Sequence, residues 1–456
     1  MISALDRSRP PRPRQPLPFR FPPFVHRPLL PGLDLYAAPL ARAPLLSLEL
    51  LLPGGAQADP AGRAGLATFT AALLDEGTAT RSGPEIADWV ERLGGALATS
   101  ADWNVAYAAC TVLSKHLRTG LDLLADVSLA PSFPDDEVER LRRRRRADLL
   151  RRRSQPAALA DEALARALYG AGPYGYPLAG RDGDVATIRR EEAAGFWRDR
   201  LCRGGATLVA AGDLDVAALE SRAREVFAAW PAAAPPPPPS VVPQELAGIE
   251  VHLVDRAGAA QTELRVGHPG PPCNHPERIP LGVLNSLLGG KFTSRINLNL
   301  RERHGYTYGA HSSFSNRLGP GPFQVAAAVA TEVAGAAVRE VLAELQRLQQ
   351  EPVAEEELAD TVLYLEGVFP YTLQTVESVA QRLAQLAVFG LPDAYFDGYR
   401  ERLRSVSRED LLRLAREHLR PDRLVVAAVG PADELRPQLA DLGQLHLAAP
   451  PVDTGA

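Results

Sequence analysis

The segment LLGGKFTSRINLNLRERHGYTYGAHSSF, residues 287–314, carries two side chains whose chemistry suits the recognition of a carbonyl group. Arg301 lies on an expected amphipathic helix, and Tyr308 follows seven residues later at the start of an expected strand, after a turn at Gly305. A guanidinium and a phenol both donate hydrogen bonds, so the pair can hold a carbonyl and stabilise an oxyanion forming on it. In the alternative interpretation, Arg301 pairs with a nearby carboxylate and Tyr308 packs at a strand edge.

Two glycines, Gly289 and Gly290, precede this helix. Without side chains they could let the backbone approach a substrate closely, which makes them candidate substrate-binding positions. They are equally consistent with a plain helix stop.

A second stretch, GLATFTAALLDEGTATRS at residues 65–82, has the frame of a helix that often carries metal-binding histidines on one face. It combines an apolar helix start, an acidic residue and a Gly-Thr pair. The interior positions are Thr68, Ala71 and Ala72, and no histidine is present. These side chains cannot hold zinc, which takes histidine, cysteine or carboxylate ligands.

The histidines elsewhere in the chain do not suggest a metal site. His268, Cys273 and His275 cluster in GHPGPPCNHPE, where the prolines favour an irregular loop over a preformed ligand face. His304 and His311 fall on different expected elements. We therefore expect no metal in this chain.

Composition excludes several classes of protein. With 456 residues, the chain is too long for one hydrophobic core, and its net charge of −5 lacks the basic excess of a nucleic-acid binder. No apolar run is long enough to cross a membrane. Pro and Arg interrupt the N-terminus where a signal peptide needs an apolar core, which favours a cytoplasmic protein, or a periplasmic one if a leader was removed.

The chain is organised as two similar halves. FPDDEVERL and VAEEELADT lie 220 residues apart, as do Gly170 and Gly390, while Gly212 and Gly430 lie 218 apart. Repetition at nearly one offset indicates duplication. Strand and helix patterns mix without strict alternation, so we expect an α+β fold with two homologous lobes of mixed or antiparallel sheet and packed helices. The expected parts are a Pro/Arg-rich arm (1–27), an N-terminal lobe (28–229), a proline-rich linker (230–248), a C-terminal lobe (249–445) and a tail (446–456).

Both motifs resemble the insulinase/pitrilysin family of inverzincins, including its processing-peptidase-like members. The stretch at 65–82 is similar to the family frame G-L-A-H-F-L-E-H-M-L-x-x-G-T, which contains the zinc motif H-x-x-E-H. Ungapped alignment places the ligand and base positions on Thr68, Ala71 and Ala72. The third ligand, a glutamate about 76 residues after the second histidine, falls on Asp148, whose alternative interpretation is a solvated or ion-paired helix residue.

The segment around Arg301 is similar to the family pattern S-R-L-x-x-x-L-R-E-x-x-G-L-x-Y-x-V. The resemblance covers about residues 28–445 and implies a clamshell half in which Arg301 and Tyr308 reach a zinc site on an opposite half. It also implies that the arginine-rich helix 139–153 borders the family's closed chamber. Its arginines would then favour acidic or phosphate-bearing peptides, although local pairing on a solvated face explains them too.

An absent zinc motif with an intact Arg/Tyr segment is similar to the non-metal subunit of two-chain zinc peptidases. This resemblance predicts a chain inactive alone, with no cofactor of its own. It would form a heterodimer with a homologous H-x-x-E-H subunit that holds the zinc, and would process peptides or small proteins. The alternatives are a non-catalytic structural or peptide-binding protein, like respiratory-complex core subunits of the same fold, and a self-associating peptide-binding clamshell.

Overall fold

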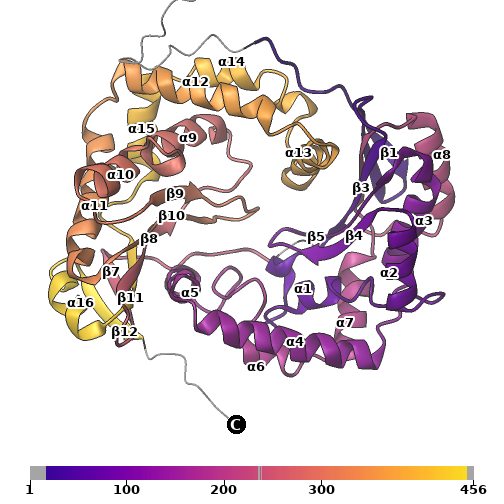
Figure 1. Cartoon of the computed structure of the whole chain (residues 1–456), viewed down its shortest axis with the longest axis horizontal. Helices are drawn as coiled ribbons and strands as arrows, with labels where there is room; N and C mark the ends of the chain where they lie inside the picture. The colour runs from indigo at the N-terminus through magenta and orange to yellow at the C-terminus, as the bar shows by residue number, and fades with distance from the viewer. Residues whose placement is uncertain (1–16, 235–236, 238, 449–456) are drawn as a thin grey trace, which may run out of the picture.

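The computed structural model describes residues 17–234, 237 and 239–448, which form two six-stranded sheets with helices packed on them (Figure 1). The strand order is β1-β2-β6-β3-β5-β4 in the first sheet and β12-β7-β11-β8-β10-β9 in the second. The predicted α+β fold of two lobes is confirmed.

In the first half of the chain the strands are β1 (Val25–Leu30), β2 (Leu33–Pro39), β3 (Leu45–Pro53), β4 (Ala96–Ala101), β5 (Val105–Leu113) and β6 (Ala206–Gly212). The helices there are α1 (Leu66–Ala71), α2 (Gly83–Arg92), α3 (Leu117–Leu129), α4 (Asp135–Arg153), α5 (Pro156–Tyr169), α6 (Asp182–Val185), α7 (Arg190–Phe196) and α8 (Val216–Val226). Pro156 is the first residue of α5, a position where proline is well accommodated, and the extended Gln155 before it separates α4 from α5.

In the second half the strands are β7 (Glu250–Asp255), β8 (Gln261–Pro269), β9 (Ala310–Phe314), β10 (Pro322–Ala330), β11 (Val425–Gly430) and β12 (Gln444–Ala448). The helices there are α9 (Arg278–Asn285), α10 (Arg295–Asn297), α11 (Ala334–Gln350), α12 (Glu355–Tyr371), α13 (Val376–Phe389), α14 (Tyr399–Arg404), α15 (Arg408–His418) and α16 (Ala432–Leu439). β12 includes residues that the sequence analysis placed in the tail.

The two sheets repeat one topology. In the first, β2 is parallel to β6, and β3 is antiparallel to both β6 and β5. In the second, β7 is parallel to β11, and β8 is antiparallel to both β11 and β10. The sheets differ at one edge, where β1 is antiparallel to β2 but β12 is parallel to β7. The last residues of β6 and β11 are Gly212 and Gly430, the pair that the repeat offset predicted.

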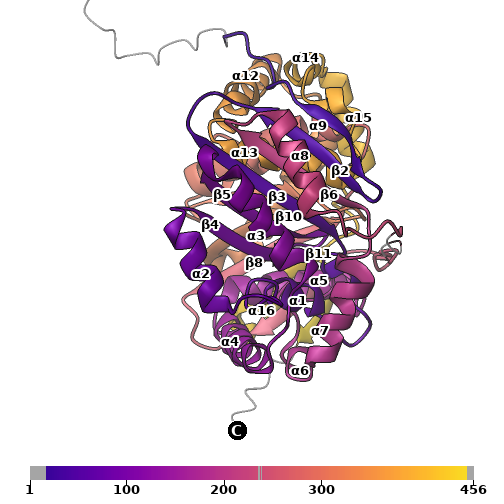
Figure 2. The same ribbon diagram turned by 90° about the vertical axis from the view of Figure 1, so that its right-hand side faces the viewer.

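One helix of each half packs on the sheet of the other half. Figure 2 faces the first sheet, with α3 and α8 in front of it, and α13 from the second half packs on its other side. The equivalent helix of the first half, α5, packs on β8 and β11 of the second sheet. Both exchanged helices end at a glycine with positive φ, Gly170 at 61° and Gly390 at 60°, a backbone conformation that favours glycine.

The loop between β9 and β10 also joins the lobes. The Arg317 guanidinium lies 4.8 Å from the ring centroid of Trp103 and 4.3 Å from that of Tyr174, both in the first half. The amide of Leu318 donates to Oδ1 of Asn104 at 2.9 Å. These contacts join the loop of the second half to the first half.

At the N-terminal side, residues 17–24 lack regular structure and pack on the second half. Phe21 stacks on Phe396 with ring centroids 4.9 Å apart, and Arg400 donates to the carbonyl of Leu17 at 2.7 Å. Among the described residues, the structure contains no helix with the length and apolar character needed to cross a membrane.

Candidate functional site

Helix α1 occupies the predicted position of the degenerate zinc helix, and its interior is packed. Thr68 is 5% exposed, and its hydroxyl lies 3.0 Å from the carbonyl of Gly65 and 3.2 Å from that of Leu178. Ala71 is fully buried, and Ala72 is partly buried against the core of the first lobe. The small side chains at these three positions therefore serve helix packing.

Arg145 of α4 points at this helix. Its Nη1 lies 3.5 Å from Thr68 Oγ1, the position that the resemblance assigns to the first zinc histidine. Burial lowers the pKa of Arg145, and the nearby Arg144 lowers it further, whereas Asp148 one turn along opposes the shift. Asp148 itself is half exposed and pairs with Arg151 at 3.0 Å. A guanidinium thus lies against the first predicted ligand position, one helical turn before the third.

Half of the other arginines in the 139–153 segment have carboxylate partners, including the pair of Arg151 with Asp148. Arg140 pairs with Glu76 and Glu137, Arg142 with Glu139, and Arg146 with Asp182. This geometry favours the locally paired interpretation for much of the helix. Within the described residues, Arg145 differs because it is turned inward without a carboxylate in ion-pair contact.

Asp59 positions the start of α1. Its Oδ2 accepts from the amide of Gly65 and its Oδ1 from that of Ala67, both at 2.7 Å, so the carboxylate satisfies amides that the helix leaves free. Gly65 has a φ of 95°, and a Cβ there would lie 2.7 Å from Gly180 Cα. Asp59 is only 7% exposed, and burial raises its pKa to about 7.

This raised pKa makes part of the protein's stability depend on pH. Because the folded state binds the Asp59 proton more tightly than the unfolded chain, that contribution is full below about pH 4 and is lost as pH rises through about 7. We expect Asp59→Asn to be less stable than the parent, because one amide loses its acceptor, but to show a smaller fall in unfolding free energy between about pH 5 and pH 8. Urea unfolding at several pH values measures both slopes. The same pH dependence of the unfolding free energy in both proteins would show that this dependence does not come from Asp59. The remaining dependence is expected from other groups such as Glu49, whose pKa is also raised to about 7 and which is present in both proteins.

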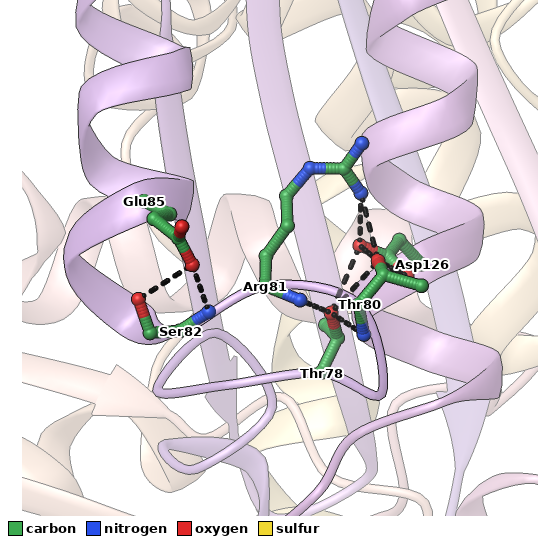
Figure 3. Close-up of polar contacts among 6 residues, drawn as sticks. All are labelled: Thr78, Thr80, Arg81, Ser82, Glu85 and Asp126. Atoms are coloured by element: carbon green, nitrogen blue, oxygen red, sulfur yellow. Dashed lines mark hydrogen bonds and ion pairs between the residues drawn. The ribbon is translucent and has the colours of Figure 1, made fainter.

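The turn after α1 is tied to α3 by one carboxylate, as Figure 3 shows. Asp126 accepts from Thr78 Oγ1 at 3.0 Å and from Arg81 Nη1 at 2.8 Å, and Thr80 Oγ1 lies 3.3 Å away. Ser82 then caps α2, where its amide and hydroxyl both donate to the Glu85 carboxylate at 2.8 Å. The Gly-Thr pair that ends the family-like frame therefore lies in a turn held by side-chain hydrogen bonds.

Removing this carboxylate is expected to destabilise the fold. Asp126→Ala leaves two hydroxyls and a guanidinium without their shared acceptor, and we expect a loss of about 2 kcal/mol of unfolding free energy. Asp88→Ala is the matched control, because Asp88 is 66% exposed and lies 3.8 Å from Arg92. Its effect should stay within about 0.5 kcal/mol in the same urea titration. Comparable losses in the two variants would show that the turn does not depend on Asp126.

The Arg301 segment is anchored at its base and exposed at its tip. Arg295 forms two bonds of 2.7 Å with Glu357, and Asn297 accepts from the amide of Ala310 at the start of β9. Arg301 follows in the π-helical turn Leu298–Arg303 and lies 4.7 Å over the ring of Phe292. Its nearest carboxylate is Glu302 at 3.5 Å.

Tyr308 is 90% exposed, and Phe292 beside Arg301 is 64% exposed. The alternative interpretation placed Tyr308 at a packed strand edge, but the side chain projects from the loop before β9 into solvent. Within the described part of the chain, the recorded polar and aromatic contacts of Arg301 come from its own segment and not from α1. The structure thus does not bring Arg301 and Tyr308 to the chain's own degenerate helix.

The two glycines differ in environment. A Cβ on Gly289 would lie 2.5 Å from Ser312 Oγ and 2.6 Å from its amide nitrogen, so the missing side chain lets β9 pack against the helix. Gly290 is exposed and ends the π-helical turn Ser286–Gly290. The geometry gives Gly289 a packing role and leaves the backbone of Gly290 accessible.

Among the residues that the structure describes, two groups of side chains that could bind a metal lie in the second lobe. In the first, His252 and His446 both face Glu250, at 3.1 and 3.9 Å. In the second, His275 and His418 lie near Glu277, which pairs with Arg413. His268, a candidate in the sequence, is fully buried with both ring nitrogens near backbone partners, and burial lowers its pKa to about 4.

Comparison with known proteins agrees with this architecture. Residues 41–182 match the model for Insulinase (Peptidase family M16), and residues 187–365 match that for the Peptidase M16 inactive domain. An uncharacterized zinc protease of Mycobacterium tuberculosis is 29% identical over 83% of this chain and 86% of its own. The uncharacterized zinc protease YmxG of Bacillus subtilis is 23% identical over 81% of this chain and 89% of its own.

Solved structures show the same fold. The peptidase M16 inactive domain from Pseudomonas fluorescens superposes with a TM-score of 0.83 at 24% identity, covering 90% of this chain and 98% of the other. A protease from Helicobacter pylori gives a TM-score of 0.84 at 18% identity, over 90% and 100%. Fold and matches together define a peptidase-like protein of two related lobes. The chain belongs to the insulinase family, peptidase family M16.

Proposed function

We propose that this chain is the non-metal subunit of a two-chain zinc peptidase that processes peptides or small proteins. The observation that carries the proposal is the exposure of Tyr308, together with a partly exposed Arg301 whose nearest carboxylate among the described residues is its neighbour Glu302. Two donors that face solvent are suited to a carbonyl brought by another chain. The match to an M16 inactive domain supports a subunit of this kind.

In this arrangement the partner subunit would hold zinc through H-x-x-E-H, and the metal would activate the attacking water. Arg301 and Tyr308 donate hydrogen bonds to the substrate carbonyl and stabilise the oxyanion that forms on it. The bonds between Arg295 and Glu357 and between Asn297 and Ala310 hold the segment that carries both donors. Because these bonds fix the backbone of the segment before substrate arrives, only the two exposed side chains need to become ordered on the substrate.

The family's own zinc chemistry does not fit α1 of this chain. Thr68, Ala71 and Ala72 offer no ligand set, and a guanidinium lies against Thr68. No catalytic step is therefore assigned to α1.

Co-expression with a homologous H-x-x-E-H chain tests the proposal. The two chains should co-purify, and chelator-sensitive peptide cleavage should appear with the pair but not with this chain alone. Chelator-sensitive cleavage by the purified single chain would overturn the proposal. A stable pair whose activity ignores Arg301 and Tyr308 would instead favour a structural or peptide-holding role.

A further inference from the structure

A cavity of about 210 Å³ lies in the second half of the chain, is partly open to solvent, and includes none of Arg301, Tyr308 or the residues of α1 in its lining. It is bounded by α9, α13, α14 and the loops around Pro271 and Ser315. Six aromatic residues contribute to its walls: Phe314, Phe369, Phe389, Tyr395, Phe396 and Tyr399. An apolar cavity of about 150 Å³ holds benzene, so this one has room for an aromatic or branched side chain and a small polar group.

Two arginines from different helices line the cavity. Arg278 of α9 donates to the carbonyl of Cys273 at 3.1 Å and to Asn316 Oδ1 at 2.7 Å. Arg382 of α13 donates to Gln385 Oε1 at 3.0 Å and to Thr372 Oγ1 at 3.2 Å. All four of these acceptors are neutral, so hydrogen bonding orients each guanidinium without cancelling its charge.

The lining residues include no aspartate or glutamate. Arg278 and Arg382 line the same cavity. Burial lowers the pKa of Arg382, Tyr399 opposes this shift, and the charge of Arg278 adds to it. Burial also raises the pKa values of Tyr395 and Tyr399, so both phenols stay protonated as donors. Partly buried charge without a counter-ion is unfavourable, and an anion entering the cavity would relieve it.

From this arrangement we infer that the cavity binds a carboxylate attached to an apolar group, such as the C-terminal residue of a peptide. The carboxylate would accept from Arg278 and Arg382, and the apolar side chain would pack against the aromatic walls. Taken with the proposed function, the site would select peptides that end in an apolar residue. The binding itself requires no partner subunit.

Calorimetric titration of the full chain tests the inference with N-acetyl-L-phenylalanine and its neutral amide. We expect saturable binding of the acid, and binding of the amide at least about tenfold weaker, because charge-assisted hydrogen bonds to the carboxylate are lost. Acetate, which lacks the apolar group, should also bind at least about tenfold more weakly than the acid. Equal affinity for the acid and the amide would show that the arginines do not bind the carboxylate. Equal affinity for the acid and acetate would show that the aromatic walls do not bind the apolar group.

Substitutions on both helices test whether binding depends on the cavity arginines and not on the overall charge of the protein. Arg278→Gln and Arg382→Gln should each raise the dissociation constant of the acid about tenfold or more, while Arg436→Gln on the exposed face of α16 should leave it unchanged. Melting curves of the three variants check that each is folded. Unchanged binding in both cavity variants would overturn the inference. That result would leave the reconstitution experiment unaffected, because peptide cleavage in trans depends on Arg301 and Tyr308.

Discussion

Arg301→Ala is expected to lower kcat of the reconstituted two-chain enzyme by about 10²- to 10³-fold. The physical reason is the loss of a donor to the oxyanion, which develops fully only in the transition state, so KM should change much less than kcat. Tyr308→Phe removes one hydroxyl from a residue that is 90% exposed, and it should have a loss of similar size with no effect on folding. Steady-state kinetics of the co-purified pair on a fluorogenic peptide measures both effects.

Two neighbouring residues provide matched controls. Arg303 is exposed on the same π-helical turn, and Tyr306 stacks on His304 with ring centroids 4.9 Å apart. Arg303→Ala and Tyr306→Phe should keep kcat within about twofold of the parent, as expected for residues outside the reaction site. Parent-like activity in both Arg301→Ala and Tyr308→Phe would remove the catalytic role from this chain, whatever the stability of the complex.

Much of the fold follows from local pattern. Alternating or continuous apolar runs at 47–53, 104–113 and 207–212 predict buried strands, and these ranges correspond to β3, β5 and β6 within two residues at each end. The repeat offset anticipated the common topology of the two sheets. The exchange of α5 and α13 between the lobes was not predicted, because apolar helix periodicity shows that a face is buried but not which sheet buries it.

Less of the candidate site than of the fold could be predicted from the sequence. The five consecutive arginines at 142–146 are identical in type, so no spacing rule singles out Arg145 as the one that turns toward Thr68. Asp59 lies six residues before Gly65, outside the usual capping distance, and the chain must fold back before its carboxylate reaches the helix. Both contacts depend on tertiary packing, and a single sequence gives little signal for either.

The Arg145 contact gives the second large prediction, which concerns zinc. Thr68→His, Ala72→His and Asp148→Glu together restore the three ligand types at the positions that the family resemblance assigns. We nevertheless expect this triple variant to bind essentially no zinc after dialysis. The Arg145 guanidinium lies 3.5 Å from the hydroxyl at position 68, and a unit charge about 4 Å from a divalent cation repels it by several kcal/mol at the effective dielectric constant of a protein surface.

Adding Arg145→Ala to the triple variant should then allow about one zinc ion per chain, because it removes the cation and opens space beside the ligands. The matched control adds Arg144→Ala, which removes an exposed arginine from the same helix and should leave the variant without zinc. Metal analysis of dialysed protein, with circular dichroism to check folding, distinguishes the three chains. If the triple variant binds zinc with Arg145 in place, or if the Arg144 change restores binding equally well, repulsion by Arg145 is not what excludes the metal. If only the Arg145 change restores binding, this arginine is the element that closes the family's metal position, and catalytic participation of the chain must come from its other half.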